Sequence, residues 1–402
     1  MTTKSKVPQI RFKGFSGEWE TKELGDIGSV VMNKRIFKSQ TTEKGDIPFY
    51  KIGTFGGKAD AFISRQLFED YKSKYPYPKK GDLLISASGS IGRIVEYAGK
   101  DEYFQDSNIV WLRHENQLEN SFLKQFYKIV KWNGLEGSTI QRLYNKNILE
   151  TQISFPVEKN EQTKIGDYFQ QLDKLIEQKE KKYEKLKQFK KASLVKMFPK
   201  NGADTPEIRF KGFSGEWEEK KLGDIATFTK GKGISKADVI DNGQMLCVRY
   251  GELYTAYNEV ITTIYSRTNS NIDMVYSQEN DILMPTSDVT PRGLATASAL
   301  SQSGIILGGD ILIIRSEEIV NSFFSYFVSG HKNKIIKLVS GTTVFHLYAK
   351  DIENLYLHLP SKEEQIKIGN YFQKLDTQIE LQLQEIEKLK NIKKASLAKM
   401  FV

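Results

Sequence analysis

Cysteine is nearly absent from this chain, because Cys247 is the only one among 402 residues. No disulfide can form within the chain, which indicates a reducing, cytoplasmic environment. Long hydrophobic runs are also absent, since no stretch reaches the roughly 18 apolar residues of a membrane helix. The opening segment, MTTKSKVPQIRF, lacks the apolar core of a secretory signal. We expect a cytoplasmic protein without a membrane span.

Recognisable catalytic motifs are missing as well. The sequence has no GxxxxGK[ST] loop for nucleotide phosphates and no GxSxG elbow for a nucleophilic serine. The short GKG at 231–233 predicts a turn, and Cys247 falls in an expected strand, where a core position is the simpler interpretation. The histidines, which lack metal-ligand spacing, are His114, His331, His346 and His358. The absence of these motifs favours a binding subunit, without catalytic or metal-ligating residues, over an enzyme.

The chain does contain an internal repeat. IRFKGFSGEW occupies residues 10–19 and returns unchanged at 208–217. Two further matches close each copy: EQTKIGDYFQQLDKLI with EQIKIGNYFQKLDTQI, and KKASLVKMF with KKASLAKMF. One module written twice predicts two similar domains around a pseudo-two-fold axis. Duplex DNA has the same backbone symmetry, which makes DNA the first partner to consider.

The interiors of the two copies, 28–136 and 226–340, differ far more than their edges. GDLLISASGSIGR from Gly81 aligns with NDILMPTSDVTPR from Asn280, so the apolar alternation is kept while the polar loop changes. A shared frame with different loops fits two readers of two different targets. Ordinary drift of loops after duplication is the alternative interpretation.

The charge balance is basic. Lys and Arg number 59 against 50 Asp and Glu, which gives a formal net charge of +9 and an isoelectric point near 9.1. A basic chain suits a polyanionic partner such as nucleic acid. The alternative is a soluble protein that is merely basic, since acidic residues are also abundant.

Short segments inside each copy predict strands, because they are β-branched or aromatic and are bounded by Gly, Asp or Asn. The expected strands are 48–54, 82–87, 91–97, 109–113, 245–250, 282–285 and 311–315, and the expected helices are 121–132 and 322–339. We predict an α+β fold with two globular mixed α/β domains, joined by two long antiparallel coiled-coil helices with pseudo-two-fold symmetry. The expected segments are a domain at 1–158, a helix at 159–199, a domain at 200–360 and a helix at 361–402.

The two closing helices carry a heptad seam, because apolar residues recur there at alternating steps of three and four. The seam residues that we expect to contact a partner helix are Phe169, Leu172, Ile176, Leu186, Phe372, Leu375, Ile379, Ile386 and Leu389. Neither helix can bury so long a stripe alone. We therefore expect the two helices to pair with each other, running antiparallel.

Polar residues interrupt this seam at equivalent positions, Lys179 and Gln382. They can fix the register of the pair, but extension of both side chains to solvent is the preferred interpretation. Ser361 is expected to cap the second helix, with Glu364 at capping-box spacing, and Asn160 to cap the first.

Glycine also recurs inside the helices, at Gly166 and Gly369. It costs about 1 kcal/mol relative to Ala in a helix, which indicates close packing at both places. Inheritance from the ancestral module without a packing role is the alternative.

Several polar stretches at equivalent places could contact DNA, where Arg and Lys bind phosphates and Arg, Asn, Gln, Ser and Thr reach base edges. The candidates are Lys34, Arg35, Lys51, Ser88, Ser90, Arg93, Gln141 and Arg142 in the first copy, and Lys230, Lys232, Arg249, Ser287, Thr290, Arg292 and His346 in the second. Arg93 and Arg292 could instead form surface ion pairs. Tyr144 and Tyr348 could face DNA or pack the domains onto the helices.

With these motifs in view, the chain resembles the specificity subunit of type I restriction-modification systems over nearly its whole length. The resemblance rests on GSTIQRLYNKNILETQISFPVEKNEQTKIGDYFQQLD from Gly137, on its counterpart from Gly341, and on the EW-x-x-x-x-LGDI openings from Glu18 and Glu216. One departure is Phe345, where the family often has proline, and this leaves the contacts of that segment open.

The resemblance implies two target-recognition domains, each reading one half of a split double-stranded DNA site, joined by helices that set the spacer. It also implies docking to two modification subunits, which methylate adenine, and to motor-nuclease restriction subunits. S-adenosylmethionine, ATP and magnesium are then expected on those partners. Two other classes stay open: a stand-alone bipartite DNA-binding regulator, and a coiled-coil scaffold without DNA binding.

Overall fold

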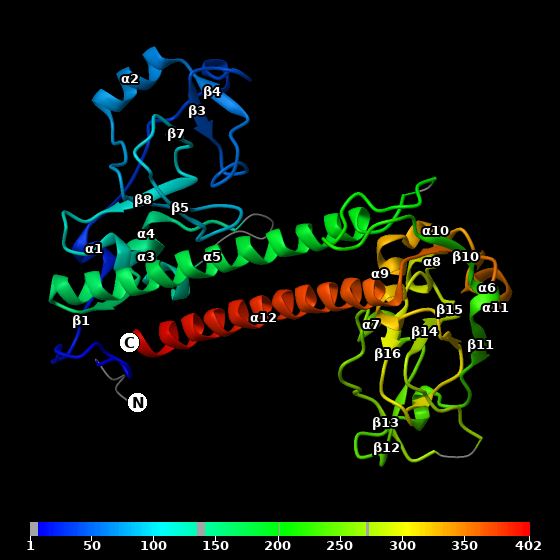
Figure 1. Ribbon diagram of the computed structural model, residues 1–402. Coiled ribbons are helices and arrows are strands. Elements are labelled where there is room, and N and C mark those ends of the chain that lie inside the picture. The colour runs from blue at the N-terminus through cyan, green and yellow to red at the C-terminus, as the bar shows by residue number, and fades with distance from the viewer. Residues whose placement is uncertain (1–6, 135–140, 201, 271–272) are drawn as a thin grey trace. The chain divides into compact units, whose positions relative to one another are not determined.

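The computed structural model describes residues 7–134, 141–200, 202–270 and 273–402. The chain divides into two compact units, one formed by 1–179 with 385–402 and the other by 180–384. Each unit therefore contains one body, which is residues 7–158 in the first and 202–360 in the second, together with one end of each long helix. The two bodies share a common frame of strands and helices, and the second contains additional short elements (Figure 1). This bears out the predicted α+β class.

The elements of the first copy are β1 (Glu20–Glu23), α1 (Leu24–Ile27), β2 (Ser29–Met32), η1 (Lys38–Gln40), β3 (Ile47–Tyr50), β4 (Ala61–Ile63), α2 (Arg65–Lys74), β5 (Leu83–Ser86), β6 (Ile94–Glu96), β7 (Tyr103–Phe104), β8 (Ile109–Arg113), α3 (Asn120–Ile129), α4 (Asn145–Leu149), β9 (Gln152–Phe155) and α5 (Lys159–Lys196). Those of the second copy are β10 (Glu218–Lys221), α6 (Leu222–Ile225), β11 (Thr227–Lys230), η2 (Lys236–Asp238), β12 (Met245–Val248), α7 (Glu252–Thr255), β13 (Arg267–Thr268), β14 (Asp281–Pro285), β15 (Ser287–Asp288), α8 (Pro291–Leu294), β16 (Ser298–Leu300), β17 (Ile306–Leu307), β18 (Ile311–Arg315), α9 (Asn321–Gly330), α10 (Lys332–Ile336), β19 (Ser340–Gly341), β20 (Phe345–His346), α11 (Ala349–Ile352), β21 (Tyr356–Leu359) and α12 (Lys362–Met400).

Each body is built around a four-stranded antiparallel sheet, ordered β2-β8-β5-β6 in the first and β11-β18-β14-β16 in the second. Side chains alternate across a strand, so each sheet buries both faces. In the first body Ile85 and Val110 face the cluster that contains α3, while Leu84 and Trp111 face a cluster with Phe104 of the β4-β3-β7 sheet. The four-stranded sheet is therefore the central layer.

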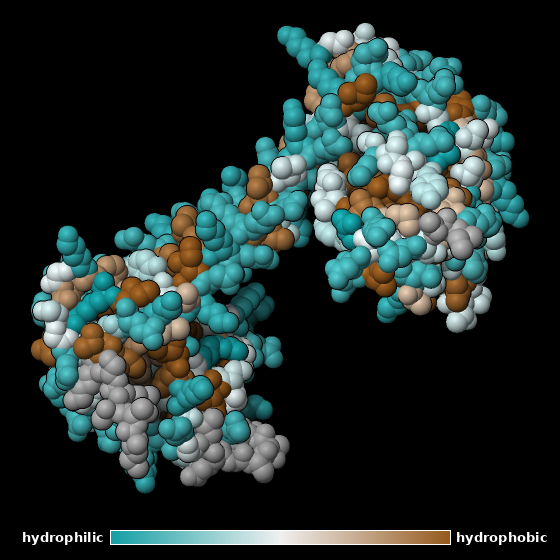
Figure 2. All heavy atoms as spheres, turned by 90° about the horizontal axis from the view of Figure 1, so that it is seen from below, coloured by the Kyte–Doolittle hydropathy of each residue, from teal (hydrophilic) through white to brown (hydrophobic). Residues whose placement is uncertain are grey.

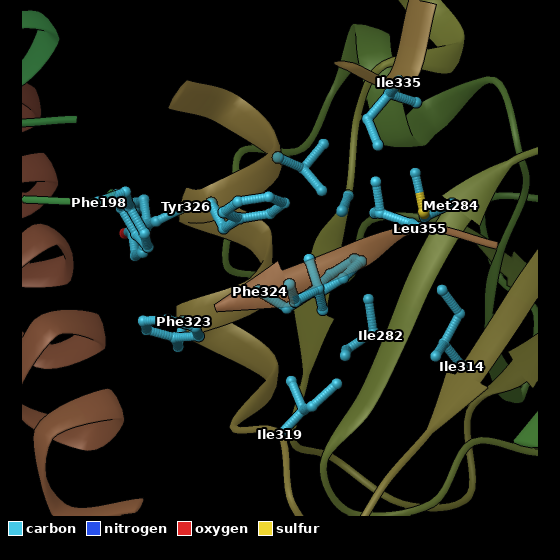
Figure 3. Close-up of a cluster of buried hydrophobic side chains, with 14 of the residues drawn as sticks. Phe198, Ile282, Met284, Ile314, Ile319, Phe323, Phe324, Tyr326, Ile335 and Leu355 are labelled. Carbon is cyan, nitrogen blue, oxygen red and sulfur yellow. The ribbon is translucent and has the colours of Figure 1, made fainter. Parts of the chain in front are cut away.

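The second body repeats these layers. Ile282 and Ile314 belong to the cluster that contains α9, and Leu283 and Ile313 belong to the cluster with β12 and β17. Figure 3 shows Phe324 on the side of α9 that faces the sheet, and Phe198 from the end of α5 on the other side of the same helix.

The end of each long helix completes the core of a body. Phe198, which follows α5, is fully buried in the second core, and Phe401, which follows α12, is 8% exposed in the first core. The start of each helix packs on the body that precedes it, through Phe169 in the first and Phe372 in the second. Each body therefore holds the start of one long helix and the end of the other.

The two long helices run antiparallel where they pair within each unit. In the first unit Lys179 contacts Glu385 at 2.6 Å and Tyr168 contacts Ser396 at 3.1 Å. In the second unit Lys190 contacts Asp376 at 2.6 Å. The nine predicted seam residues are all buried or half-buried: Phe169, Leu172, Ile176, Leu186, Phe372, Leu375, Ile379, Ile386 and Leu389.

The helix glycines mark close packing, as their recurrence predicts. A Cβ on Gly166 would lie 2.8 Å from the carbonyl carbon of Ser121 in α3. A Cβ on Gly369 would lie 3.2 Å from Cβ of Ser322 in α9 and would collide with its hydroxyl. Only glycine lets α5 and α12 approach these helices so closely.

Some local predictions are wrong. The expected helix at 322–339 is two helices, because His331 leaves the helical conformation between α9 and α10. Asn160 lies inside α5, which begins at Lys159, so it is not the cap. Gln382 is 4% exposed and does not extend to solvent.

The cap at the start of α12 is the predicted one. Ser361 does cap α12, since its hydroxyl accepts from the amide of Glu364 at 3.3 Å. Among the described residues, no helix combines the length and the apolar character that a membrane crossing needs.

Candidate DNA interface

Topology gathers the predicted contact loops at one edge of each four-stranded sheet. In the first body Met32 pairs with Val110 and Ser86 pairs with Ile109, both antiparallel. The ends of β2 and β5 therefore share an edge with the start of β8. We call this the loop edge, formed by 33–35, 87–93 and 105–108 in the first body. The same pairing places 231–233, 286–292 and 308–310 together in the second.

The segment after residue 140 joins the loop edge. Arg142 forms a β-bridge with Ser88, and the amide of Leu143 donates to the carbonyl of Ala87 at 2.9 Å. In the second body His346 pairs with Ser287, which lies in the corresponding loop. Two stretches that are distant in sequence therefore form one surface in each body.

The loop after β3 also reaches this edge. The amide of Gln105 donates to the carbonyl of Tyr50 at 2.9 Å, and Nη1 of Arg93 donates to the carbonyl of Phe55 at 2.8 Å. Lys51 lies at the start of this loop, and Arg249 holds the corresponding place after β12. The polar stretches singled out in each copy therefore meet at one edge.

Several predicted side chains of the first body have partners within the protein. Arg35 pairs with Asp106 at 2.8 Å and Lys51 with Asp60 at 2.9 Å. Nζ of Lys34 lies 5.0 Å from the ring centre of Tyr75. These contacts are exposed, and exposed ion pairs are worth about 0–1 kcal/mol. A phosphate could therefore replace the carboxylates at little energetic expense.

The remaining candidates of the first body differ in accessibility. Ser88 is 6% exposed and donates to Oδ1 of Asn108 at 2.7 Å, so it holds the loop in place. Ser90, Gln141 and Arg142 are exposed.

The second body pairs its candidate cations more completely. Lys230 contacts Asp310 at 2.9 Å, and Lys232 contacts Asp273. Arg249 binds Glu252, with Nη2 at 2.9 Å from the carboxylate.

Its loop 286–292 is organised by Asp288. The carboxylate of Asp288 accepts from the hydroxyl of Thr290 at 2.8 Å, and Thr290 in turn caps α8 by accepting from the amide of Gly293 at 3.3 Å. Arg292 is exposed on α8, while Ser287 is half-exposed. No ion pair joins Arg292 or Arg142 to any residue in the described ranges.

The sequence did not single out Asn108 and Asp310, which occupy the same place directly before β8 and β18. Asp310 has a positive φ of 60°, and so does Ser107 beside Asn108, at 54°. Asn108 accepts a hydrogen bond from Ser88, and Asp310 pairs with Lys230 at the end of β11. Each residue stands directly before an apolar strand at the equivalent position of its repeat, and this pattern could have identified both.

Two further expectations concern Tyr144, Tyr348 and Cys247. The tyrosines are 46% and 48% exposed, so neither is enclosed between its body and a long helix. Cys247 is fully buried in β12, and burial raises the pKa of its thiol to about 11. A protonated, enclosed thiol is a core residue and not a nucleophile. In the part of the chain that the structure describes, no group of three His, Cys, Asp or Glu side chains could hold a metal ion.

Known proteins share this organisation. Residues 16–188 and 214–391 each match the family described as type I restriction modification DNA specificity domain. A putative type I restriction enzyme specificity subunit of Haemophilus influenzae is 55% identical over 173 residues, which cover 40% of this chain and 45% of that protein. The putative MjaX specificity subunit of Methanocaldococcus jannaschii is 26% identical over 94% of this chain and 91% of its own length.

A solved structure has a similar fold. The crystal structure of a type I restriction-modification S subunit from M. genitalium aligns with a TM-score of 0.60 at 18% identity, covering 98% of this chain and 99% of that one. Because the family match covers both repeats and most of the sequence, the chain belongs to the type I restriction-modification DNA specificity family.

Proposed function

We propose that each body reads one half of an asymmetric, bipartite site in double-stranded DNA. The observation that carries this proposal is the loop edge, where the same strands present different polar side chains in the two bodies. Asn108 before β8 corresponds to Asp310 before β18, Arg142 corresponds to His346, and the loop 87–93 reads ASGSIGR where 286–292 reads TSDVTPR. Base edges are distinguished by such donors and acceptors, so two different edges select two different half-sites.

The paired long helices set the distance between the half-sites and hold two modification subunits. Support for docking comes from apolar side chains that these helices leave exposed, including Phe189 at 54% and Leu381 at 58%. Figure 2 shows hydrophobic patches among the hydrophilic side chains along the helices. In water such patches favour contact with another protein.

Catalysis belongs to the partners in this proposal. The modification subunits use S-adenosylmethionine to methylate adenine, and motor-nuclease restriction subunits use ATP and magnesium. The chain itself supplies DNA recognition and assembly, and it acts in the cytoplasm.

Exchange of one body interior tests the proposal. Residues 28–136 are replaced by the corresponding interior of another family member, and the matched variant exchanges 226–340. Methylated adenines are then mapped in DNA from cells that express each variant with the modification subunits. The first exchange changes only one half-site, and the second changes only the other. A change in both half-sites, or in neither, contradicts the proposal.

The alternatives give different results in the same cells. A stand-alone regulator binds its site tightly without co-purifying a methyltransferase. A coiled-coil scaffold shows no salt-dependent DNA affinity, whereas phosphate contacts make DNA binding fall steeply with salt.

A further inference from the structure

We infer that Arg142 and His346 are the base-reading residues of their loop edges, and that Tyr144 and Tyr348, two positions later, contact the DNA backbone. The inference rests on the proposed function and assigns roles within it. Residues that differ between the two bodies are assigned to base edges, which vary with the DNA sequence. Residues that are identical in both bodies are assigned to the sugar-phosphate backbone, which is constant.

The backbone frame around these residues is the same in both bodies. Arg142 bridges to Ser88, and His346 pairs with Ser287. The next residue is a buried leucine in each body. The amide of Leu143 donates to the loop after β5 at 2.9 Å, and the amide of Leu347 donates to the loop after β14 at 3.1 Å. One strand register therefore presents a guanidinium in one body and an imidazole in the other.

Both side chains are available for a ligand. Arg142 is exposed and His346 is half-exposed, and neither forms an ion pair with a described residue. His346 borders an open hollow of about 400 Å³, which is also lined by Lys230, Thr286 and Asp310. The polar atoms around the imidazole are thus arranged about a space that a base edge could enter.

The chemistry of the two side chains predicts different preferences. A guanidinium donates two parallel hydrogen bonds and pairs best with O6 and N7 of guanine. A neutral imidazole offers one donor and one acceptor. The first half-site should therefore contain a guanine that depends on Arg142, while His346 selects a different pattern in the second.

Unlike Arg142 and His346, the tyrosines are the same residue in both bodies. Tyr144 precedes α4 and Tyr348 precedes α11, and about half of each side chain is exposed. A phenol hydroxyl can donate to a phosphate oxygen whatever the base. Identical placement in both bodies suits that role.

The experiment uses the complete complex, purified with its modification subunits, and selects from random DNA duplexes. Arg142→Ala should reduce discrimination at one position of one half-site by roughly tenfold or more and leave the other half-site unchanged. His346→Ala should do the reverse. Arg142→Lys keeps the charge without the fork, so it should retain affinity while the preference for guanine weakens, since an ammonium can still donate to guanine.

The tyrosine variants give the opposite signature. Tyr144→Phe and Tyr348→Phe should each weaken binding by a similar factor for all sequences, with the selected site unchanged. Controls are Arg113→Ala, at the other end of β8, and Tyr356→Phe in β21, which is 54% exposed. Both controls should bind as the wild type does.

Three outcomes overturn the inference. They are an unchanged site for folded Arg142→Ala and His346→Ala, a changed base preference for the tyrosine variants, and equal effects of the controls. If the wild-type complex selects no bipartite site, the proposed function fails together with the inference. If it selects one that the variants leave intact, only the inference fails.

Discussion

Arg11 and Glu161 form a two-point ion pair, in which Nε and Nη2 of the arginine each lie 2.7 Å from a carboxylate oxygen. The carboxylate is 1% exposed, at the start of α5. Arg209 and Glu364 repeat the pair at the start of α12, with the same distances. The opening segment of each repeat, which is identical in the two copies, is thereby fastened to the long helix of its own copy.

Loss of this arginine should strongly destabilise the first unit. Arg11→Ala leaves the Glu161 carboxylate buried without its cation, and breaking such a pair costs about 3–5 kcal/mol. Arg65→Ala is the control, because Arg65 and its partner Asp101 are both about half exposed and water screens such pairs, so they contribute little to stability. Denaturant unfolding of the full chain measures both. Equal small losses would mean that the buried pair adds no net stability.

Much of this architecture was accessible from the sequence. The long helices, their antiparallel pairing and the strands β3, β5, β8, β12, β14 and β18 follow from apolar periodicity and from the repeat. The close packing at Gly166 and Gly369 follows from the recurrence of glycine where it is unfavourable. Each of these features occurs in both copies of the repeat, which strengthens its prediction from sequence.

Other features depend on tertiary contacts that no local pattern reveals. Strands β1 and β10 read ETKE and EEKK, which have low strand propensity, and they form only because β9 and β21 pair with them. The convergence of loops at one sheet edge depends on strand order. Burial of Gln382 in α12 is set by the elements packed around it, which the heptad pattern alone does not show.

Alanine substitutions at the two helix glycines should distinguish crowding by a neighbouring side chain from crowding by a neighbouring backbone. Gly369→Ala gains helix propensity of about 1 kcal/mol, yet overpacking against Ser322 typically costs about 1–3 kcal/mol. The variant Gly369→Ala with Ser322→Gly should recover stability, because the backbone amide of Phe323 lies at an ordinary 3.5 Å. Gly166→Ala with Ser121→Gly should recover less, since a backbone carbon lies at 2.8 Å. Thermal unfolding measures the four variants, and equal recovery in both pairs would contradict this account.

Two carboxylates contact Lys190, those of Asp376 and Glu259. They should change the free energy of unfolding in opposite directions as the pH falls. Burial raises the pKa of Asp376 despite the charge of Lys190. For Glu259, burial acts in the same direction, but Lys190 and Ser329 outweigh it and lower the pKa. Native protein therefore binds the proton of Asp376 more tightly than the unfolded chain, and that of Glu259 less tightly.

Two variants isolate these contributions. As the pH falls towards the ordinary aspartate pKa of about 3.9, the stability of the wild type relative to Asp376→Asn should rise. Relative to Glu259→Gln it should fall, because the stabilisation by ionised Glu259 is lost as the pH drops through its lowered pKa. Denaturant unfolding at several pH values checks both slopes. Slopes of the same sign would contradict the assignment.

Arg292 should contribute to DNA affinity from its exposed position on α8. If it binds a phosphate, Arg292→Ala should weaken binding to all sequences and reduce the salt slope by about 1. If it reads a base, the loss should be about 1–3 kcal/mol at one position of the site. Binding isotherms of the complex across salt, on matched and mismatched duplexes, distinguish the two. No effect in either assay would remove Arg292 from the interface.

The last prediction concerns the long helices as a ruler between half-sites. Helix α5 has 38 residues, so at 1.5 Å per residue it extends about 57 Å, longer than the roughly 35 Å of one turn of B-DNA. Four residues inserted near Lys181 and four near Glu385 lengthen each helix by about 6 Å, or nearly two base pairs at about 3.4 Å each. The half-sites should keep their sequences while the spacer grows by one or two base pairs.

The antiparallel pairing supplies the control for this experiment. Matched insertions preserve contacts such as Lys179 with Glu385 and Lys190 with Asp376 on either side. An insertion in one helix alone shifts one partner past the other, so that variant should unfold at a lower temperature. Circular dichroism first establishes that the double insertion is helical, because a four-residue insertion disturbs the heptad. If the complex that contains the folded double variant still methylates sites with the original spacer, the helices do not set the distance, and the spacing must be fixed by the partner subunits instead.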